Sequence, residues 1–112
     1  KRAAAKVTAV PARLDGRSVN SCLFPAVQAE GCQVMTIEGV EAHPELARIQ
    51  KALVDYGAVQ CGFCSPGMIM STVALLQKNP KPTEEEIRRG LSGNICRCTG
   101  YQAMVDAIQS LA

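Results

Sequence analysis

The sequence predicts an α+β protein, with strands and turns in residues 1–40 and four short helices in residues 41–112. Turn signals and β-branched residues dominate the first part, whereas apolar residues recur at helical spacing in the second part. The chain has 112 residues, of which 47% are hydrophobic and 20% are charged. This size and composition suit one small globular domain, or one domain joined to part of another.

Two strands are expected in the N-terminal part. Residues 14–17 (LDGR) form a turn signal, and residues 18–22 (SVNSC) alternate after it like a short strand. Residues 32–37 (CQVMTI) give the clearest strand pattern in the chain because they are rich in β-branched side chains.

Signals at their ends delimit the four predicted helices. The first begins at Pro44 and stops before Gly57, a glycine placed as a C′ residue. The second begins with Ser65 as N-cap, followed by a proline, and ends at residues 79–80 (NP). Residues 83–86 (TEEE) form a capping box that opens the third helix. The expected apolar positions are Leu46, Ile49, Leu53 and Tyr56; Met68, Ile69, Val73 and Leu76; Ile87 and Leu91; and Met104, Val105, Ile108 and Leu111.

Composition argues against several classes of function. A net charge of +2, no tryptophan and only two tyrosines and two phenylalanines give no platform for nucleic acid. No apolar run approaches the roughly 18 residues that span a bilayer. The basic start is interrupted by Lys6 before an apolar signal-peptide core can form, so we expect the cytoplasm rather than the periplasm. No catalytic triad, phosphate loop or pair of acid/base carboxylates stands out.

The six cysteines are the unusual feature of the composition. Cys61 and Cys64 are separated by two residues, and Cys96 and Cys98 by one. Each pair precedes a predicted helix, where free N–H groups and the helix dipole stabilise the thiolate form that binds metals. Two such pairs, with 31 residues between them, are typical of a metal site.

Four interpretations of these cysteines compete. Disulfides within such short spacings would be strained, and a secreted context is not indicated. A thiol–disulfide redox pair would leave the second pair of cysteines without a role. A zinc ion held by four thiolates and a [2Fe–2S] cluster with two cysteines on each iron both fit the spacing. Paired helix N-termini favour the cluster, whose negative charge increases on reduction, but spacing alone leaves both open.

Two longer motifs carry a resemblance to a known family. Residues 60–68 (QCGFCSPGM) and 92–101 (SGNICRCTGY) resemble the two halves of the iron–sulfur signature of molybdenum hydroxylases. This group includes xanthine dehydrogenases, aldehyde oxidoreductases and aerobic carbon monoxide dehydrogenases. The similarity extends over about residues 14–112 and includes residues 15–22 (DGRSVNSC), 36–39 (TIEG), 79–83 (NPKPT) and 86–88 (EIR).

The resemblance implies an electron-transfer subunit of an oxidoreductase, with the catalytic centre on another chain. A C-terminal four-helix bundle, residues 41–112, would bind one [2Fe–2S] cluster through Cys61, Cys64, Cys96 and Cys98. In the family this cluster lies nearest the molybdopterin of the large subunit, and the residues matching Gln60 and Cys98 face that pterin. Electrons would continue toward a FAD-binding medium subunit. The alternative is a zinc-stabilised interaction module with four cysteine ligands and no redox function.

The N-terminal part departs from the family pattern. The family's ferredoxin-like β-grasp domain normally binds a further cluster, and only Cys22 matches one of its ligands. Residues 7–10 (VTAV) stand where a Cys-Gly-Ala-Cys motif is expected. We therefore expect residues 1–40 to be a truncated or divergent remnant of the β-grasp domain that holds no cluster. Cys22 and Cys32 are then expected to be buried as small hydrophobic side chains.

Overall fold

The computed structural model describes residues 11–112 and confirms the α+β class. Within this range no helix is both long and apolar enough to cross a bilayer. The elements in chain order are β1 (Pro11–Leu14), β2 (Arg17–Asn20), the 3-10 turns η1 (Ser21–Leu23) and η2 (Ala26–Ala29), β3 (Val34–Met35), α1 (Ile37–Val40), α2 (Pro44–Asp55), α3 (Ser65–Lys78), α4 (Glu84–Leu91) and α5 (Gln102–Gln109).

The three strands form one antiparallel sheet in the order β2-β1-β3. The predicted turn joins β1 to β2 through Asp15 and Gly16, which have φ angles of 47° and 88°. Two positive φ angles give a tight hairpin whose twist matches that of the strands. The Asp15 carboxylate accepts a hydrogen bond from the Gln33 N–H at 2.9 Å, which fixes the approach to β3.

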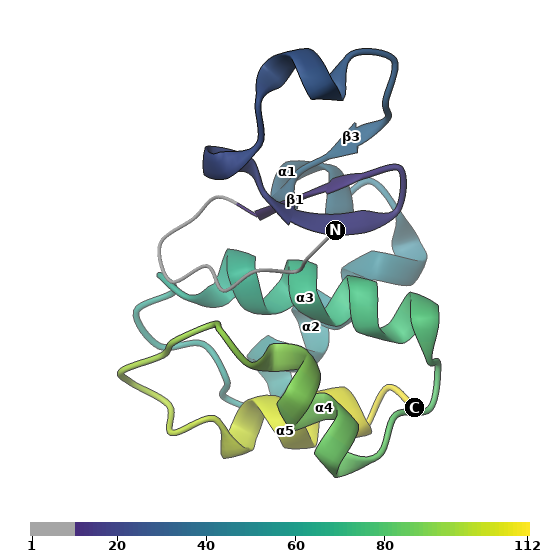
Figure 1. Ribbon diagram of the computed structural model, residues 1–112. Coiled ribbons are helices and arrows are strands. Elements are labelled where there is room, and N and C mark those ends of the chain that lie inside the picture. The colour runs from purple at the N-terminus through teal and green to yellow at the C-terminus, as the bar shows by residue number, and fades with distance from the viewer. Residues whose placement is uncertain (1–10) are drawn as a thin grey trace.

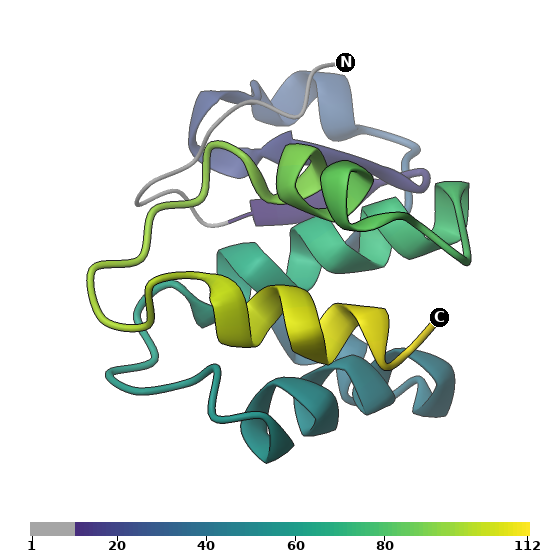
Figure 2. The same ribbon diagram turned by 90° about the horizontal axis from the view of Figure 1, so that it is seen from below.

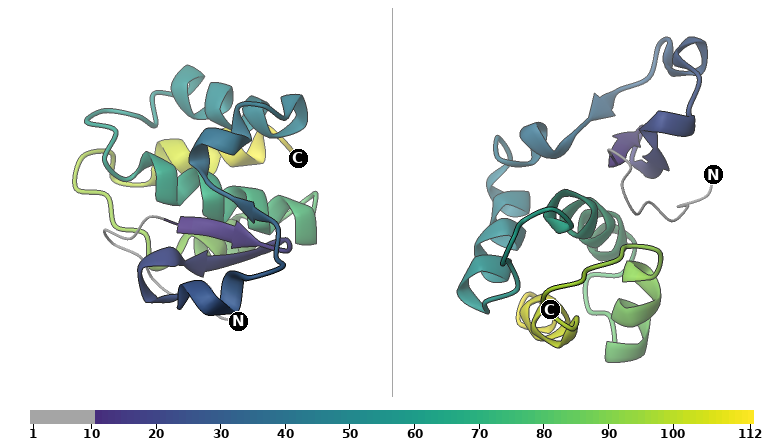
Figure 3. Two further views of the ribbon diagram at one scale, coloured as in Figure 1. Left: turned by 90° about the horizontal axis from the view of Figure 1, so that it is seen from above. Right: turned by 90° about the vertical axis from the view of Figure 1, so that its left-hand side faces the viewer.

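Helix α3 is the centre of the molecule. It lies between the sheet and helices α4 and α5 (Figure 1), and it contacts β1, β2, α1, α2 and α4. The four longer helices, α2 to α5, surround a common interior (Figure 3). Within this group α2 contacts α3 and α5, and α4 likewise contacts α3 and α5. Sequence predicted a single apolar face for α3, but the helix is covered on several sides. Its buried residues are Gly67, Met68, Ile69, Met70, Ser71, Thr72, Val73 and Leu76.

The helix ends agree with the sequence signals except at one position. Gly57 follows the end of α2 with a φ of 69°, as expected for a C′ glycine. Thr83 and Glu86 form both hydrogen bonds of the predicted capping box at the start of α4. The prediction of Ser65 as N-cap of α3 is wrong, because Cys64 takes that position and Ser65 is the first helical residue.

Residues 21–40 differ most from expectation. The strand predicted to reach Cys22 ends at Asn20, and the turn η1 leaves Cys22 exposed rather than buried. Cys32 is partly buried, as expected for a filling residue, and packs on a small cluster around the sheet. The second predicted strand shortens to β3, because Ile37 and Val40 turn into α1 and pack on the main core. Residues 7–10 lie outside the described range.

Candidate metal centre

Four cysteines lie on two loops at one end of the molecule. The loop between α2 and α3 carries Cys61 and Cys64, and the loop between α4 and α5 carries Cys96 and Cys98. Figures 1 and 2 show these loops side by side at the same end. Gly62, with a φ of 84°, makes the bend between the first two cysteines, a conformation that favours glycine.

The four thiols are arranged as two pairs. Cys64 lies beside Cys96, and Cys61 lies beside Cys98, close enough for each neighbour to raise the pKa of Cys64 and of Cys98 respectively. Cys96 is buried and Cys64 partly buried, whereas Cys61 and Cys98 are exposed, so the site has an inner and an outer pair. Within residues 11–112, no three His, Cys, Asp or Glu side chains converge where a single metal ion could bind them all. The four sulfurs therefore form two pairs of donors, and the two pairs lie close enough to affect each other's pKa values.

Hydrogen bonds distinguish the two thiols of the inner pair. Burial by itself would raise the pKa of Cys96, but donors on Thr99 and the backbone lower it to about 7. The Thr99 hydroxyl and N–H lie 3.2 Å and 3.4 Å from the Cys96 sulfur. Burial and the hydrogen bond to Cys96 raise the pKa of Cys64 to about 12. Cys96 is thus the first thiolate of the pair, and Cys64 must lose its proton when a metal binds.

Backbone groups of the loops also face the outer pair. The Phe63 N–H lies 3.5 Å from the Cys61 sulfur. The hydrogen bond with Cys61 raises the pKa of Cys98, while the Cys61 N–H lowers it. The expectation that both pairs sit at helix N-termini holds for Cys64 at α3 but not for the second pair. Because α5 begins only at Gln102, loop N–H groups approach the sulfurs of that pair instead.

Three residues position the cysteine loops through hydrogen bonds, and the sequence did not predict this role for them. Thr99 donates to Cys96, and the Tyr101 hydroxyl accepts a hydrogen bond from the Cys96 N–H at 2.9 Å. Asn94 donates from its amide to Ser71 Oγ at 2.9 Å, which ties the second loop to α3. Thr99 lies only three residues after Cys96, so its contact with that sulfur is local in the sequence. The role of Tyr101 depends on its left-handed backbone, with a φ of 74°, which the sequence does not indicate.

Replacing Tyr101 with phenylalanine is expected to lower the stability of the holoprotein by about 1–3 kcal/mol, because the part-buried Cys96 N–H loses its acceptor. Chemical denaturation followed by the loss of visible absorption measures this change. Tyr56→Phe is the matched control. Tyr56 is half-exposed at the end of α2 and takes no part in the hydrogen bond to the Cys96 N–H. Equal losses for both variants would contradict the assigned role of Tyr101.

The surface beside the outer pair is exposed and partly apolar. Gln60 is exposed directly before Cys61, and Cys98 is exposed on the neighbouring loop. Phe63 and Ile95 are large hydrophobic side chains of the same two loops, and they are 71% and 57% exposed. The structure thus places both residues predicted to face a pterin on an open surface, and their role toward a pterin stays a prediction.

Comparison with known proteins gives consistent matches. Residues 36–109 match a family described as a [2Fe-2S] binding domain. The chain is 52% identical over 97 residues to the xanthine dehydrogenase iron-sulfur-binding subunit of Escherichia coli O157:H7, covering 85% of this chain and 61% of that subunit. It is 46% identical over 95 residues to the nicotine 6-hydroxylase small subunit of Paenarthrobacter nicotinovorans, covering 85% and 57% respectively.

Solved structures extend this likeness to the fold. The aldehyde oxidoreductase of Desulfovibrio gigas superimposes with a TM-score of 0.84 at 44% identity, over 94% of this chain and 12% of that one. Quinoline 2-oxidoreductase of Pseudomonas putida 86 superimposes with a TM-score of 0.83 at 40% identity, over 97% of this chain and 68% of that one. The chain spans about three fifths of the length of the two curated small subunits above.

Proposed function

The chain belongs to the [2Fe-2S] binding domain family, and on this premise we propose that it carries electrons within a molybdenum-containing hydroxylase. The resemblance is confirmed by a curated relative that is a xanthine dehydrogenase subunit and by a solved structure of an aldehyde oxidoreductase. One observation carries the proposal for this chain. The fold brings Cys61 beside Cys98 and Cys64 beside Cys96, which gives two thiol pairs at one end of the molecule.

The donor set fits a [2Fe–2S] cluster better than a zinc ion. A two-iron cluster takes four cysteine thiolates, two at each iron, whereas structural zinc requires four donors around a single point. The residues that would hold the cluster are therefore Cys61 and Cys98 at one iron, and Cys64 and Cys96 at the other. When bound, the cluster supplies a one-electron carrier. Thr99 and the loop N–H groups donate toward sulfur, which stabilises the negative charge of the ligands.

The exposed outer pair supports a partner on this face. We propose that Gln60 and Cys98 face the molybdopterin of a large subunit, as the resemblance implies. Phe63 and Ile95 would then be buried in that interface, because large exposed hydrophobic side chains commonly mark protein contacts. Electrons would leave the chain toward a FAD-binding subunit or another acceptor.

The domain organisation follows the same resemblance. We infer that α2 to α5 form the four-helix bundle of the family, a proposal supported by the closed ring of contacts among these helices. Residues 1–40 would be a remnant of the β-grasp domain. Apart from the four paired thiols, the sequence offers only Cys22 and Cys32, so we propose that this chain holds one cluster.

Metal analysis combined with electron paramagnetic resonance tests the proposed function. We expect about two irons per chain and, after reduction, the signal of a [2Fe–2S] cluster. About one zinc per chain with no paramagnetic signal would contradict electron transfer and would favour the zinc-stabilised module. Purification without oxygen keeps the cluster from being lost before the measurement.

A further inference from the structure

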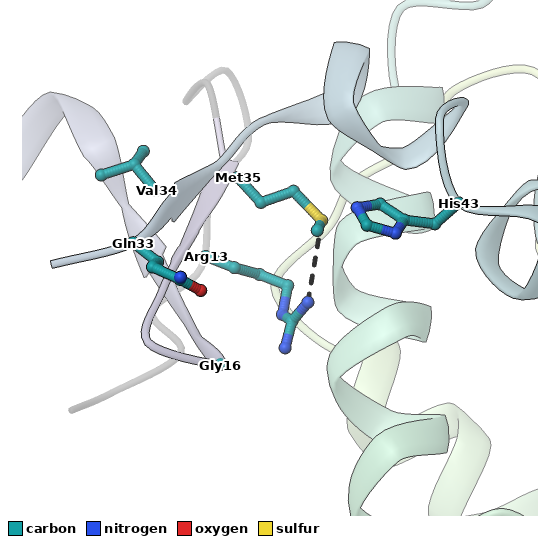
Figure 4. Close-up of a pocket in the computed structure, with 6 residues that line it drawn as sticks. All are labelled: Arg13, Gly16, Gln33, Val34, Met35 and His43. Carbon is teal, nitrogen blue, oxygen red and sulfur yellow. Dashed lines mark hydrogen bonds between the residues drawn. The ribbon is translucent and has the colours of Figure 1, made fainter.

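A second site lies between the sheet and the start of α2. It is a cavity of about 360 Å³, and none of its lining residues belongs to the cysteine-bearing loops. Small-molecule sites in proteins commonly have volumes of about 300–1,000 Å³. The lining residues, drawn in Figure 4, are Arg13, Gly16, Gln33, Val34, Met35 and His43.

Arg13 is the unusual member of this set, because as a residue it is only 9% exposed. Its Nη1 donates to the Met35 sulfur at 3.7 Å, a weak acceptor, and its Nη2 donates to Gln77 Oε1. Its Nε is buried and has no partner among the described residues. A guanidinium has five N–H groups, so three of the five are left without a protein acceptor in this part of the chain.

Among residues 11–112, no carboxylate forms an ion pair with this buried charge. The ion pairs of residues 11–112 join other residues, and the ten residues before them contain neither aspartate nor glutamate. Burial accordingly lowers the pKa of Arg13. A buried cation without a counter-ion is costly, so proteins normally pair such groups or reserve them for a ligand. The described residues thus supply no counter-ion to Arg13, and an anion bound in the cavity would provide one.

The other walls of the cavity indicate which anion fits. His43 faces Arg13 across the cavity, and the Met35 side chain lies between them (Figure 4). Gln33 adds an amide, while Val34, 54% exposed, and Met35 add apolar surface. With the fixed positive charge of Arg13 and the apolar surface of Val34 and Met35, the cavity matches a single negative charge on a short hydrocarbon body. A planar carboxylate also matches the fork of a guanidinium in shape.

We propose that this cavity binds a small aliphatic carboxylate, with Arg13 as its charged anchor and Gln33 and His43 as polar neighbours. The site would be separate from the electron-transfer loops and independent of the cluster. Ligand binding here would link the hairpin β1–β2, strand β3 and the start of α2, because the lining residues come from these three regions.

Titration of the intact 112-residue chain, labelled with ¹⁵N, with sodium butyrate at constant ionic strength tests the proposal. The expected result is a saturable shift of the Arg13 Nε–H and Gln33 side-chain signals. Arg13→Met should weaken butyrate binding about tenfold or more, because a charged hydrogen-bonding partner is lost. Arg17→Met is the matched control, since Arg17 is an exposed arginine of β2 that does not line the cavity. This variant should bind butyrate with the same affinity as the wild type.

Other arms of the titration decide the remaining outcomes. If Arg13→Met does not fold, His43→Ala replaces an exposed residue and should still weaken butyrate binding about threefold or more. Inorganic phosphate should bind more weakly than butyrate, and equal or tighter binding of phosphate would overturn the carboxylate assignment. An identical response to sodium chloride, no saturable shift with butyrate, or equal binding by wild type and a folded Arg13→Met would overturn the site itself.

Discussion

Serine at position 64 or 96 is expected to reduce bound iron from about two per chain to near zero and to abolish the reduced-state resonance signal. Each substitution removes one thiolate from the inner pair, and a hydroxyl is a poor replacement for a soft sulfur ligand. Because these two side chains are partly or fully buried, water cannot readily take the vacant position. Iron analysis and electron paramagnetic resonance of Cys64→Ser and Cys96→Ser measure the loss.

Two other cysteines of the same chain serve as controls. Cys32→Ser changes a thiol that is partly buried, as Cys64 is, and Cys22→Ser changes an exposed one. Both variants should keep the wild-type iron content and signal. Loss of the signal in Cys22→Ser would show that this residue is a ligand, and a full signal in Cys64→Ser would contradict the proposed pairing.

Adding a methyl group at Gly67 of α3 is expected to displace the loop that carries Cys96 and Cys98. In Gly67→Ala the new Cβ would lie 2.6 Å from Asn94 Oδ1, which is closer than real contacts allow. The Asn94 side chain cannot easily retreat, because it donates to Ser71 Oγ and to the Leu91 carbonyl. Alanine gains about 1 kcal/mol in helix propensity, whereas the steric cost is about 1–3 kcal/mol, so we expect a net loss of stability of up to about 2 kcal/mol.

Chemical denaturation of Gly67→Ala, with iron analysis, checks both consequences. Because Asn94 is two residues before Cys96, displacement of the loop should also lower the iron content. Gly90→Ala is the matched control, since its Cβ would meet only the flexible end of the Leu75 side chain at 3.1–3.4 Å. Wild-type stability and full iron content in Gly67→Ala would show that the close approach of α3 and the loop has no role.

Local signals in the sequence predicted most of the fold, and tertiary packing decided the rest. Gly57 and the capping box of Thr83 and Glu86 mark helix ends through contacts within a few residues, so the sequence alone indicates them. Ile37 belongs to a β-branched run that predicts a strand. It instead begins α1, because burial of Val40 in the main core outweighs the local preference. The same competition shortened the strand before it.

The candidate site shows the same division. Spacing and resemblance predicted the four cysteines, since ligand pairs are local in sequence. The choice of which thiols pair across the loops, Cys61 with Cys98 and Cys64 with Cys96, depends on how α3 and α5 pack, and no local pattern encodes it. The contributions of Asn94 and Tyr101 depend on contacts with α3 and on a left-handed backbone, so they too appear only in three dimensions.

The central position of α3 has a consequence for the order in which the protein folds. The hairpin β1–β2 packs on α3, and the hydrogen bond between Arg13 and Gln77 joins residues 64 positions apart. Closing so long a loop is entropically unfavourable until the helix offers a formed surface to dock on. We therefore expect the helices to assemble first and the hairpin to dock last, so that destabilising changes in the hairpin accelerate unfolding and leave the refolding rate almost unaltered.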